Sequence, residues 1–449
     1  MKECDRTAIH GGLSLEEIKE TVLSAVADET AKRVLLIPPD YTRYHSGGGY
    51  ITNVLYHYFT DQGAAVDILP ALGTHHALTP EKWQMMFLDI PRERMITHDW
   101  RNDLVKIGSV PADFVANQTE GCWTEAVPVE INRRVVDGGY DLILSIGQVV
   151  PHEVVGMANH AKNLFVGVGG SHMINDTHMI SAVYGIERIM GRDHTPVRAI
   201  FDWAFEHCLH DLPIGFIQTV TTTDRNVPSD HQILSHGIFC GKGRRCYEAA
   251  VALAQQKNVI RVQKPIQKCV VYLDPLEFQT TWIGNKSVYR TRMAIADGGE
   301  LLILAPGVSA FGEDKTIDSL IRKYGYRGRD TIMSAFSRPE NEDLHANMSA
   351  AAHLIHGSSE GRFKITYAVQ QKAQEEIKSV GYQAASCEDM LSRYHPAQLQ
   401  NGWNTLPDGE EIYFIDNPAI GLWMPMITTA SAASSSVERS CPCTATAYT

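Results

Sequence analysis

Short runs of aliphatic residues, each followed by a polar loop, recur along the first two-thirds of the chain and constrain its fold most. They alternate with stretches of helical periodicity, and this alternation is typical of an α/β domain with a mostly parallel sheet. The expected strands cover residues 33–38, 65–71, 141–147 and 163–168. The expected helices cover residues 13–30, 51–63 and 173–190. The N-terminal part is therefore predicted to hold a Rossmann-like, mostly parallel sheet flanked by helices.

A second α/β domain is predicted from a change in composition near residue 265. The sequence PIQKCVVYLDP begins it, a helix is expected over 289–296, and ELLILAP is expected to form a strand. We divide the chain into an N-terminal α/β domain, a C-terminal α/β domain, a segment that returns to the N-terminal domain, and a disordered tail rich in Ser, Ala and Thr. Their bounds are 1–264, 265–400, 401–426 and 427–449. The active site is expected in the cleft between the two α/β domains.

The charge and hydropathy of the chain exclude two classes of partner. A formal net charge of −12, with no basic stripe, argues against nucleic-acid binding. No apolar run is long enough to span a bilayer, and the polar N-terminus lacks the hydrophobic part of a secretory signal. The nine cysteines are scattered, as in reduced cytoplasmic proteins, and the close pair Cys441 and Cys443 lacks further metal ligands nearby. We expect a cytoplasmic protein that acts on a small molecule.

Polar, potentially reactive residues follow the carboxyl ends of three expected strands. The loops are PDYTR at 39–43, GTHH at 73–76 and VPHE at 150–153. In an open parallel sheet, ligands bind in the crevice outside the carboxyl ends of the strands. The three loops are therefore expected to form one site.

Two loop histidines, His75 and His152, are candidate acid–base residues. An imidazole titrates near neutral pH, so it can take up or return a proton at little cost. Two such groups on opposite faces of one carbon would suit a reaction that inverts that carbon. The alternative for each is a loop-capping or solvent-exposed histidine.

The first loop also contains Arg43 and Asp40. A planar guanidinium can hold a carboxylate by two hydrogen bonds, so Arg43 is a candidate for binding an acidic substrate. Asp40 could orient either the arginine or a histidine. The alternative for Arg43 is a solvated loop residue.

A glycine-rich turn follows Lys162 and leads into a helix. Gly167, Gly169 and Gly170 could place free backbone N–H groups at the helix N-terminus, as in a phosphate cradle. It is not a dinucleotide fingerprint, because His172 stands where the third glycine would be. His178 lies within the helix, where a lone histidine is more often packed or solvated than a ligand. A HExxH zinc motif is absent.

Together and in this order, these segments resemble the nickel-dependent lactate racemase family. The segments that carry the resemblance are PDYTR, GTHHALT, PHEVVGMANHAKN, the glycine-rich stretch after it, and INDTH. The resemblance covers most of residues 30–310 and is faint beyond them.

The resemblance implies a nickel pincer nucleotide as cofactor, a pyridinium mononucleotide that carries Ni(II) through one carbon and two sulfurs. The N-terminal domain would be the catalytic domain, Lys162 would be the covalent attachment point, and His178 would be the protein's nickel ligand. His75 and His152 would be the two catalytic bases, and Arg43 would hold the substrate carboxylate. The other residues expected near the cofactor are Asp40, Thr42, Gly169 and Gly170. Separate enzymes of the host would have to make the cofactor.

The implied reaction is racemisation or epimerisation at C2 of a 2-hydroxy acid. The C2 hydrogen would leave as hydride to the electron-poor pyridinium while one histidine takes the hydroxyl proton. Hydride return to the other face of the planar 2-keto acid would invert C2, with the second histidine as acid.

Departures from the family pattern indicate a substrate other than lactate. Ala158, Asn159 and His160 stand where close relatives of lactate racemase have Ser-Gly-Gly. The pattern Tyr-Gln-x-x-Lys becomes Tyr289-Arg290-x-x-Met293, so Tyr289 and Arg290 are the expected substrate-binding residues here. A more polar pocket suits a polyhydroxy acid, and AAHLIHGSSEGRFKITYA resembles a branch associated with hexonate epimers. We therefore expect a sugar acid such as gluconate or mannonate.

Three alternatives stay open at this point. The substrate could be lactate or another short 2-hydroxy acid. The protein could be a different metal-dependent enzyme, a lyase or hydrolase that uses histidines of these loops on zinc or iron. The histidines that such a metal enzyme would use are some of His75, His152, His172 and His178. The protein could also be a non-catalytic protein that binds sugar acids.

Overall fold

The computed structural model describes residues 1–75, 77–223 and 233–426. The chain forms two compact units, each with its own sheet. Unit 1 comprises Met1–Val110, Val127–Thr177 and Met190–Val259, and unit 2 comprises Pro111–Ala126, His178–Ile189 and Ile260–Thr449. Among the described residues, no helix has the length and apolar character needed to cross a membrane.

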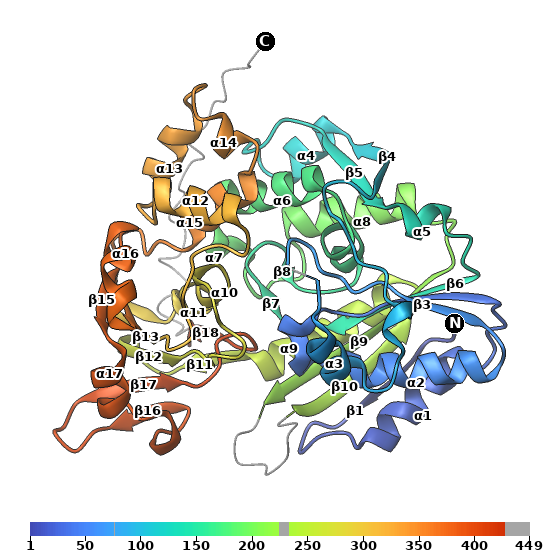
Figure 1. The fold of residues 1–449 in the computed structure, drawn as a ribbon, viewed down its shortest axis with the longest axis horizontal. Coiled ribbons are helices and arrows are strands. Elements are labelled where there is room, and N and C mark those ends of the chain that lie inside the picture. The colour runs from blue at the N-terminus through green and yellow to red at the C-terminus, as the bar shows by residue number, and fades with distance from the viewer. Residues whose placement is uncertain (76, 224–232, 427–449) are drawn as a thin grey trace. The chain divides into compact units, whose positions relative to one another are not determined.

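The sheet of unit 1 has six strands in the order β1-β10-β9-β6-β2-β3. Their bounds are β1 (Cys4–Thr7), β2 (Arg33–Ile37), β3 (Ala65–Ile68), β6 (Leu142–Gln148), β9 (Ile214–Thr223) and β10 (Ile233–Gly241). Strands β3, β2, β6 and β9 run parallel, whereas β10 and β1 join as antiparallel edge strands. This mostly parallel, helix-flanked sheet confirms the predicted α/β fold (Figure 1).

The parallel strands form because their aliphatic residues are buried on both faces of the sheet. In β2, residues 34–37 are all buried, which is typical of a strand covered on both sides. Helices α1 (Leu15–Val26) and α2 (Gly48–Asp61) contribute Val22, Leu55 and Phe59 to the core that includes Val34 and Leu36. A capping box of Ser14 and Glu17 fixes where α1 begins.

The remaining elements of unit 1 cover and extend this sheet. Its other helices are η1 (Tyr41–Ser46), α3 (Pro80–Phe87), η2 (Arg92–Arg94), α5 (Arg133–Asp137), η3 (Asn163–Gly167), α8 (Pro196–Cys208) and α9 (Arg244–Asn258). Its antiparallel pairs are β4 (Leu104–Val110) with β5 (Val127–Asn132), and β7 (Pro151–His152) with β8 (Gly156–Met157). Helix α6 (Ser171–Tyr184) contains the division between the units.

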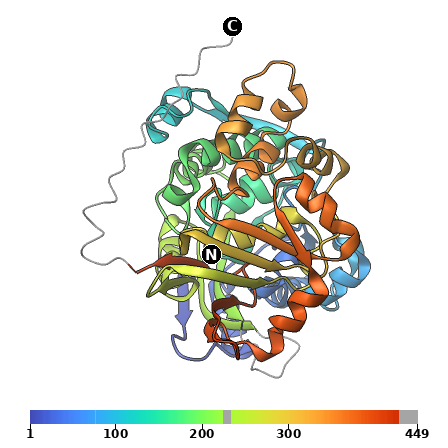
Figure 2. The ribbon, with the colours of Figure 1, turned by 90° about the vertical axis from the view of Figure 1, so that its left-hand side faces the viewer.

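Unit 2 has a six-stranded sheet in the order β15-β14-β13-β12-β17-β16, coloured yellow to red in Figure 2. All neighbours are parallel except β16 and β17. Its strands are β12 (Ile266–Tyr272), β13 (Ile295–Leu304), β14 (Lys364–Val369), β15 (Gln383–Ser386), β16 (Gly402–Thr405) and β17 (Glu411–Ile415). A smaller pair joins β11 (Val259–Val262) to β18 (Leu422–Pro425). One core cluster contains Val270, Leu302, Tyr394 and Phe414.

Helices flank the sheet of unit 2, and two short segments from earlier in the chain belong to this unit. The helices are α4 (Ala112–Gln118), α7 (Ile186–Ile189), α10 (Thr281–Gly284), α11 (Lys286–Thr291), α12 (Lys315–Tyr324), α13 (Arg329–Phe336), α14 (Glu342–His345), α15 (Met348–His356), η4 (Gln371–Ala373), α16 (Gln374–Ser379), α17 (Cys387–Arg393) and η5 (Pro396–Gln398). The units therefore divide near residue 260, close to the expected boundary, but unit 2 also takes in 111–126 and 178–189.

Three predictions about secondary structure and domains differ from the structure. Residues 163–168 were expected to form a strand, but 163–167 form the π-helix η3, because a short apolar run does not distinguish a buried helix from a strand. The helix expected over 289–296 ends at Thr291, and strand β13 begins at Ile295. Residues 401–426 do not return to the first domain; they supply β16 and β17 to the second sheet. The tail 427–449 lies outside the described residues.

Candidate functional site

The three polar loops follow β2, β3 and β6, which are adjacent parallel strands. Their carboxyl ends therefore lie at one edge of the sheet, as the sequence predicts. An isolated bridge between Pro39 and Ala71 keeps the first two loops side by side beyond the strands. His76, in the second loop, lies outside the described residues.

Asp40 and His75 form a close pair across the first two loops. Asp40 Oδ2 lies 2.5 Å from His75 Nδ1, and Thr42 Oγ1 donates to Asp40 Oδ1 at 2.8 Å. The aspartate is buried, with 4% of its surface exposed, whereas the histidine side chain keeps 28% exposed. Gly73 turns the second loop with φ of +56°, a left-handed value that favours glycine. The structure thus brings together two residues that the sequence placed in one site.

The electrostatics of Asp40 fix which nitrogen of His75 carries the proton. Burial alone would raise the pKa of this carboxyl, but the charge and hydrogen bond of His75, with help from Thr42 and Arg43, lower it overall. Asp40 is therefore an ionised acceptor, and the Nδ1–H of His75 donates to it. In the neutral ring, Nε2 then carries the lone pair and can accept a proton.

Unlike His75, which donates a hydrogen bond from Nδ1, His152 accepts one at Nδ1. It ends β7, which turns back through a short hairpin to β8, and 5% of its surface is exposed. The backbone N–H of Val154 donates to His152 Nδ1 at 3.1 Å, so the neutral ring carries its proton on Nε2. Glu153 Oε2 lies 3.8 Å from the same Nδ1. A doubly protonated His152 would therefore have a carboxylate close by as counter-ion.

Lys162 immediately precedes the π-helix η3. The amide of Asn163 anchors the start of this helix, because its Nδ2 donates to Ser145 Oγ at 3.1 Å and to the carbonyl of Ile37 at 3.4 Å. These partners belong to β6 and β2, so Lys162 starts from the same edge of the sheet as the loops. A π-helical turn in place of regular structure is frequent at functional sites.

The amine of Lys162 has a pKa far below that of an ordinary lysine. Burial, reinforced by the positive charge of Arg43 and Arg198, lowers the pKa of this lysine to about 7, although Glu153 and Asp40 oppose the shift. Among the described residues, none forms a hydrogen bond or salt bridge with its ammonium group. Near neutral pH a large fraction of this side chain is a free amine, which is the nucleophilic form.

Arg43 lies in η1 and is partly buried. Its charge acts on both Asp40 and Lys162. Its local backbone departs from helical geometry, with φ of −118° and ψ of 32°. An anionic group near Arg43 would therefore also be near the Asp40–His75 pair and Lys162.

The glycine-rich turn is tightly packed. A Cβ at Gly169 would lie 1.8 Å from the carbonyl oxygen of Phe165, and one at Gly170 would lie 2.2 Å from Glu130 Oε2. Glu130 also accepts from the backbone N–H of His172 at 3.3 Å and contacts its Nδ1 at 2.9 Å. Close packing thus explains why these positions are glycine, and a role for Gly169 and Gly170 in binding a cofactor stays a prediction. Glu130 lies in β5, and no sequence signal linked it to this turn.

The other expected site residues belong to unit 2. His178 is a partly buried residue of α6. The hydroxyl of Tyr289 lies 2.5 Å from Nδ1 of buried His353, whose Nε2 lies 2.8 Å from the hydroxyl of Tyr326. Arg290 is buried and donates to the carbonyl of Gly421 at 3.4 Å. His353 is the residue that sequence reasoning missed; its motif, AAHLIH, carries no recognised spacing to Tyr289.

How these unit 2 residues approach the loops of unit 1 stays a prediction, as does the cleft between domains. Within the described part of the chain, no group of three or more His, Cys, Asp or Glu side chains could hold a metal ion by itself.

A family model links the N-terminal part of the chain to lactate racemases. Residues 13–188 match the family described as the lactate racemase N-terminal domain. This range contains the three loops, Lys162 and α6. No curated protein matches the chain.

Two solved structures have the same fold over nearly the whole chain. A crystal structure of a Thermotoga maritima protein has a TM-score of 0.79 and 23% identity, and the match covers 93% of this chain and 99% of that one. The lactate racemase apoprotein of Thermoanaerobacterium thermosaccharolyticum has a TM-score of 0.65 and 18% identity, and the match covers 92% and 93%. The N-terminal part of the chain is thus similar to the lactate racemase N-terminal domain, as the sequence motifs predict, and the two solved structures show a shared fold.

Proposed function

We infer that this protein is a racemase or epimerase that inverts C2 of a 2-hydroxy acid with a nickel pincer nucleotide attached to Lys162. The observation that carries the proposal is the combination, at one sheet edge, of the Asp40–His75 pair with a lysine whose pKa lies near 7. A proton acceptor and a nucleophilic amine are the two groups that such chemistry requires from the protein.

The residues present fit the proposed cofactor. Lys162 offers an amine that is not engaged by another described side chain and is partly uncharged at neutral pH, as covalent attachment requires. Because a pincer ligand supplies most of the metal's donors, one histidine from the protein suffices, and His178 is the proposed ligand. When bound, the cofactor would supply a reversible hydride acceptor for the C2 hydrogen, so that a planar 2-keto acid could be reduced again from either face.

The two histidines would divide the proton work. His75, held by Asp40 through Nδ1, can accept the hydroxyl proton at Nε2. His152 would act as the acid from its doubly protonated form, which the carboxylate of Glu153, 3.8 Å from Nδ1, stabilises. After it gives up the Nε2 proton, the ring remains neutral with its proton on Nδ1. The roles reverse when the reaction runs in the other direction.

Arg43 is the proposed partner of the substrate carboxylate. Its positive charge already acts on Asp40 and Lys162, so a carboxylate held by it would lie near both the base and the attachment point. In this proposal Tyr289, whose hydroxyl is held by His353, and Arg290 contact the rest of the substrate. The polar residues at these positions suit a sugar acid such as gluconate or mannonate.

The proposal is tested by co-expressing the chain with cofactor-making enzymes and measuring intact mass and nickel content. We expect an added nucleotide mass that maps to Lys162, with one nickel per chain, and no adduct in a Lys162→Arg control. Gluconate, mannonate and lactate are then tested for inversion of C2. An unmodified wild-type mass without nickel would refute the proposal. Turnover of lactate with no change in the hexonates would keep the reaction but replace the sugar-acid substrate with a short acid.

A further inference from the structure

We propose that Arg198, a buried residue of α8, is the positioning residue that holds the loop before Lys162 in the conformation needed for cofactor attachment. This inference rests on the proposed function, in which Lys162 is the attachment point. The residue lies outside the three loops, and no motif in the sequence singles it out.

The loop before Lys162 has an unfavourable backbone conformation. Asn159 and His160 have φ of +70° and +56°, so two successive residues with side chains lie in the left-handed region. Non-glycine residues adopt this region uncommonly; Asn and His do so more often than most, but as single residues rather than in succession. Glycine at both positions would adopt this backbone without strain, whereas this chain needs external contacts to stabilise it.

Arg198 supplies the central contacts. Its Nη2 donates to the carbonyl of Met157 at 2.7 Å and to that of Asn159 at 3.2 Å. The hydroxyl of Tyr247 donates to the same Met157 carbonyl at 2.8 Å and lies 2.7 Å from Arg198 Nη2. One guanidinium therefore holds a carbonyl group just before the left-handed turn and another within it.

Further contacts complete the support of this loop. The side-chain amide of Asn159 donates to the carbonyl of Gly147 in β6 at 2.8 Å. The ring of His160 stacks on Phe216 of β9, with 4.0 Å between ring centroids. The loop is thus held between α8 and the sheet, and Lys162 follows it directly.

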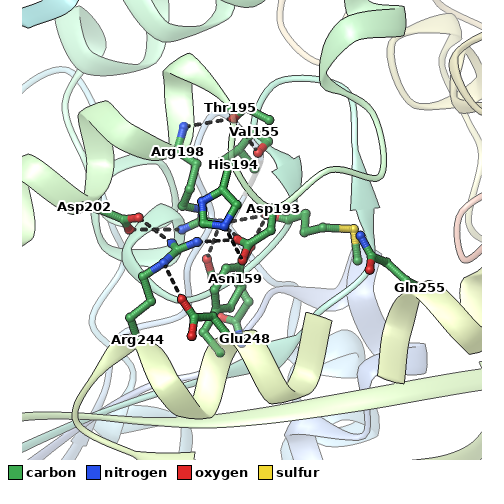
Figure 3. Close-up of polar contacts among 12 residues, drawn as sticks. Val155, Asn159, Asp193, His194, Thr195, Arg198, Asp202, Arg244, Glu248 and Gln255 are labelled. Carbon is green, nitrogen blue, oxygen red and sulfur yellow. Dashed lines mark hydrogen bonds and ion pairs between the residues drawn. The ribbon is translucent and has the colours of Figure 1, made fainter. Parts of the chain in front are cut away.

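A chain of charges holds Arg198 itself in place (Figure 3). Its guanidinium lies over the ring of Tyr247, 4.4 Å from the centroid, and its Nη1 is 3.9 Å from Asp202 Oδ1. Arg244 forms a salt bridge with Asp202 and another with Asp193, at 2.5 Å for the latter. This network holds the arginine in place beside the loop.

The burial of Arg198 is not explained by its contribution to stability alone. Only 1% of its surface is exposed, and Nε and Nη1 have no hydrogen-bond partner among the described residues. A buried cation that is only partly paired usually contributes little to stability or opposes it. Its good hydrogen bonds go to the loop and to Tyr247, which is consistent with selection for the loop geometry.

Arg198 also acts on Lys162 through its charge. The pKa of Lys162 is lowered by burial first, then by Arg43 and also by Arg198, whereas Glu153 and Asp40 raise it. Loss of the Arg198 charge would therefore leave the amine more protonated. The hydrogen bonds of Arg198 hold the loop before Lys162 in place, and its positive charge favours the neutral form of the Lys162 amine.

The test measures the reactivity of Lys162 in the full-length chain made without cofactor enzymes. Acetylation by acetic anhydride is followed at a series of pH values by peptide mass spectrometry. In wild type, we expect half-maximal reactivity near pH 7. In Arg198→Met the midpoint should rise; a rise of one unit lowers the reaction rate at pH 7 about fivefold, and each further unit lowers it about tenfold. Arg198→Lys, which keeps the charge, should restore the midpoint toward wild type.

Two further variants separate positioning from general destabilisation. Tyr247→Phe removes one support of Met157 and should give an intermediate loss of attachment in co-expressed protein. Val22→Ala opens a cavity in the core under α1 and should lower Tm without moving the midpoint.

The inference would be overturned if Arg198→Met kept both the wild-type midpoint and the wild-type extent of attachment. It would also be overturned if Val22→Ala moved the midpoint equally. An absence of any adduct in wild type would instead refute the proposed function, while the acetylation profile would still report on Arg198.

Discussion

Replacing Asp40 by Asn should reverse the tautomer of His75 with little change in shape. Asp40 is an ionised acceptor 2.5 Å from Nδ1, so in wild type the ring carries its proton on Nδ1. An asparagine retains the volume, and when its Nδ2 faces the ring it donates to Nδ1. The proton of the neutral ring then moves to Nε2, where the proposed base needs a lone pair.

The expected loss of activity in Asp40→Asn follows from the proposed role of the Asp40–His75 pair as a general base. General base catalysis by a positioned side chain contributes about 10²- to 10⁴-fold, and the substitution removes the base together with its anionic partner. At about 1.4 kcal/mol per tenfold, we expect a loss of about 3–5 kcal/mol in transition-state stabilisation, seen in kcat. The attachment at Lys162 should persist, because Asp40 raises rather than lowers the pKa of that amine.

The assay combines a structural readout with a kinetic one. ¹⁵N NMR of the histidine rings in the full-length chain should show His75 protonated at Nδ1 in wild type and at Nε2 in Asp40→Asn. Turnover is compared at equal cofactor content. Thr42→Val is the matched control, because it removes the 2.8 Å bond to the other carboxylate oxygen but leaves the ring contact; it should cost about tenfold at most. An unchanged His75 tautomer in Asp40→Asn, or turnover within threefold of wild type, would refute this reasoning.

Three other variants test separate parts of the site. Lys162→Met should stabilise the fold more at pH 6 than at pH 9.5. The folded-state pKa of Lys162, about 7, lies below the unfolded value of 10.5, so the native protein pays a cost for burying the charged amine at low pH, and this cost falls as pH rises between the two pKa values. Urea unfolding should show a difference in this stabilisation between the two pH values on the order of 2 kcal/mol, allowing for screening. Gly169→Ala should lower stability by about 1–3 kcal/mol or more, since its Cβ would lie 1.8 Å from the Phe165 carbonyl oxygen, whereas Gly243→Ala, with nothing within 4 Å, should leave Tm nearly unchanged. His152→Gln should keep the adduct by mass but lose turnover by about 10²-fold or more, and full activity would remove this residue from the mechanism.

Local sequence pattern predicted the parts of the fold whose burial is regular. Strands β2 and β6 are continuous aliphatic runs because both of their faces are covered, and a run of that kind is visible without any structure. The segment after Lys162 has a similar composition, yet it forms a π-helix. Its Asn163 is anchored by Ser145 and Ile37. Contacts with residues so distant in sequence cannot be predicted from the local pattern of aliphatic residues. The second-sheet strands at 401–415 were missed for the same reason, because sheet membership depends on distant partners.

The site shows the same division between local and distant information. The order of polar loops after parallel strands predicted that the loops of Asp40 and His75 would lie at one edge of the sheet, since strand direction determines where the loops lie; which residue Asp40 would orient was left open. The left-handed turn at Asn159 and His160 was not predicted, because Asn and His adopt a positive φ far less often than glycine does. Arg198 could not be found either, because its function depends on backbone carbonyl groups, which every residue has.

The differing partners of the two histidines have a chemical consequence. In the proposed mechanism one histidine takes the hydroxyl proton and the other returns one, and two histidines with identical partners would have no built-in difference. His75 is tied to a carboxylate at 2.5 Å and is ready to accept a proton, whereas the nearest carboxylate to His152 Nδ1 is at 3.8 Å and a backbone N–H occupies that nitrogen in the neutral ring. In the proposed mechanism, His152 would have to gain a proton and exchange the Val154 N–H for Glu153 before it could act as an acid. His75 would already be arranged to accept a proton, so the step that recharges His152 would be the one in which the surroundings rearrange.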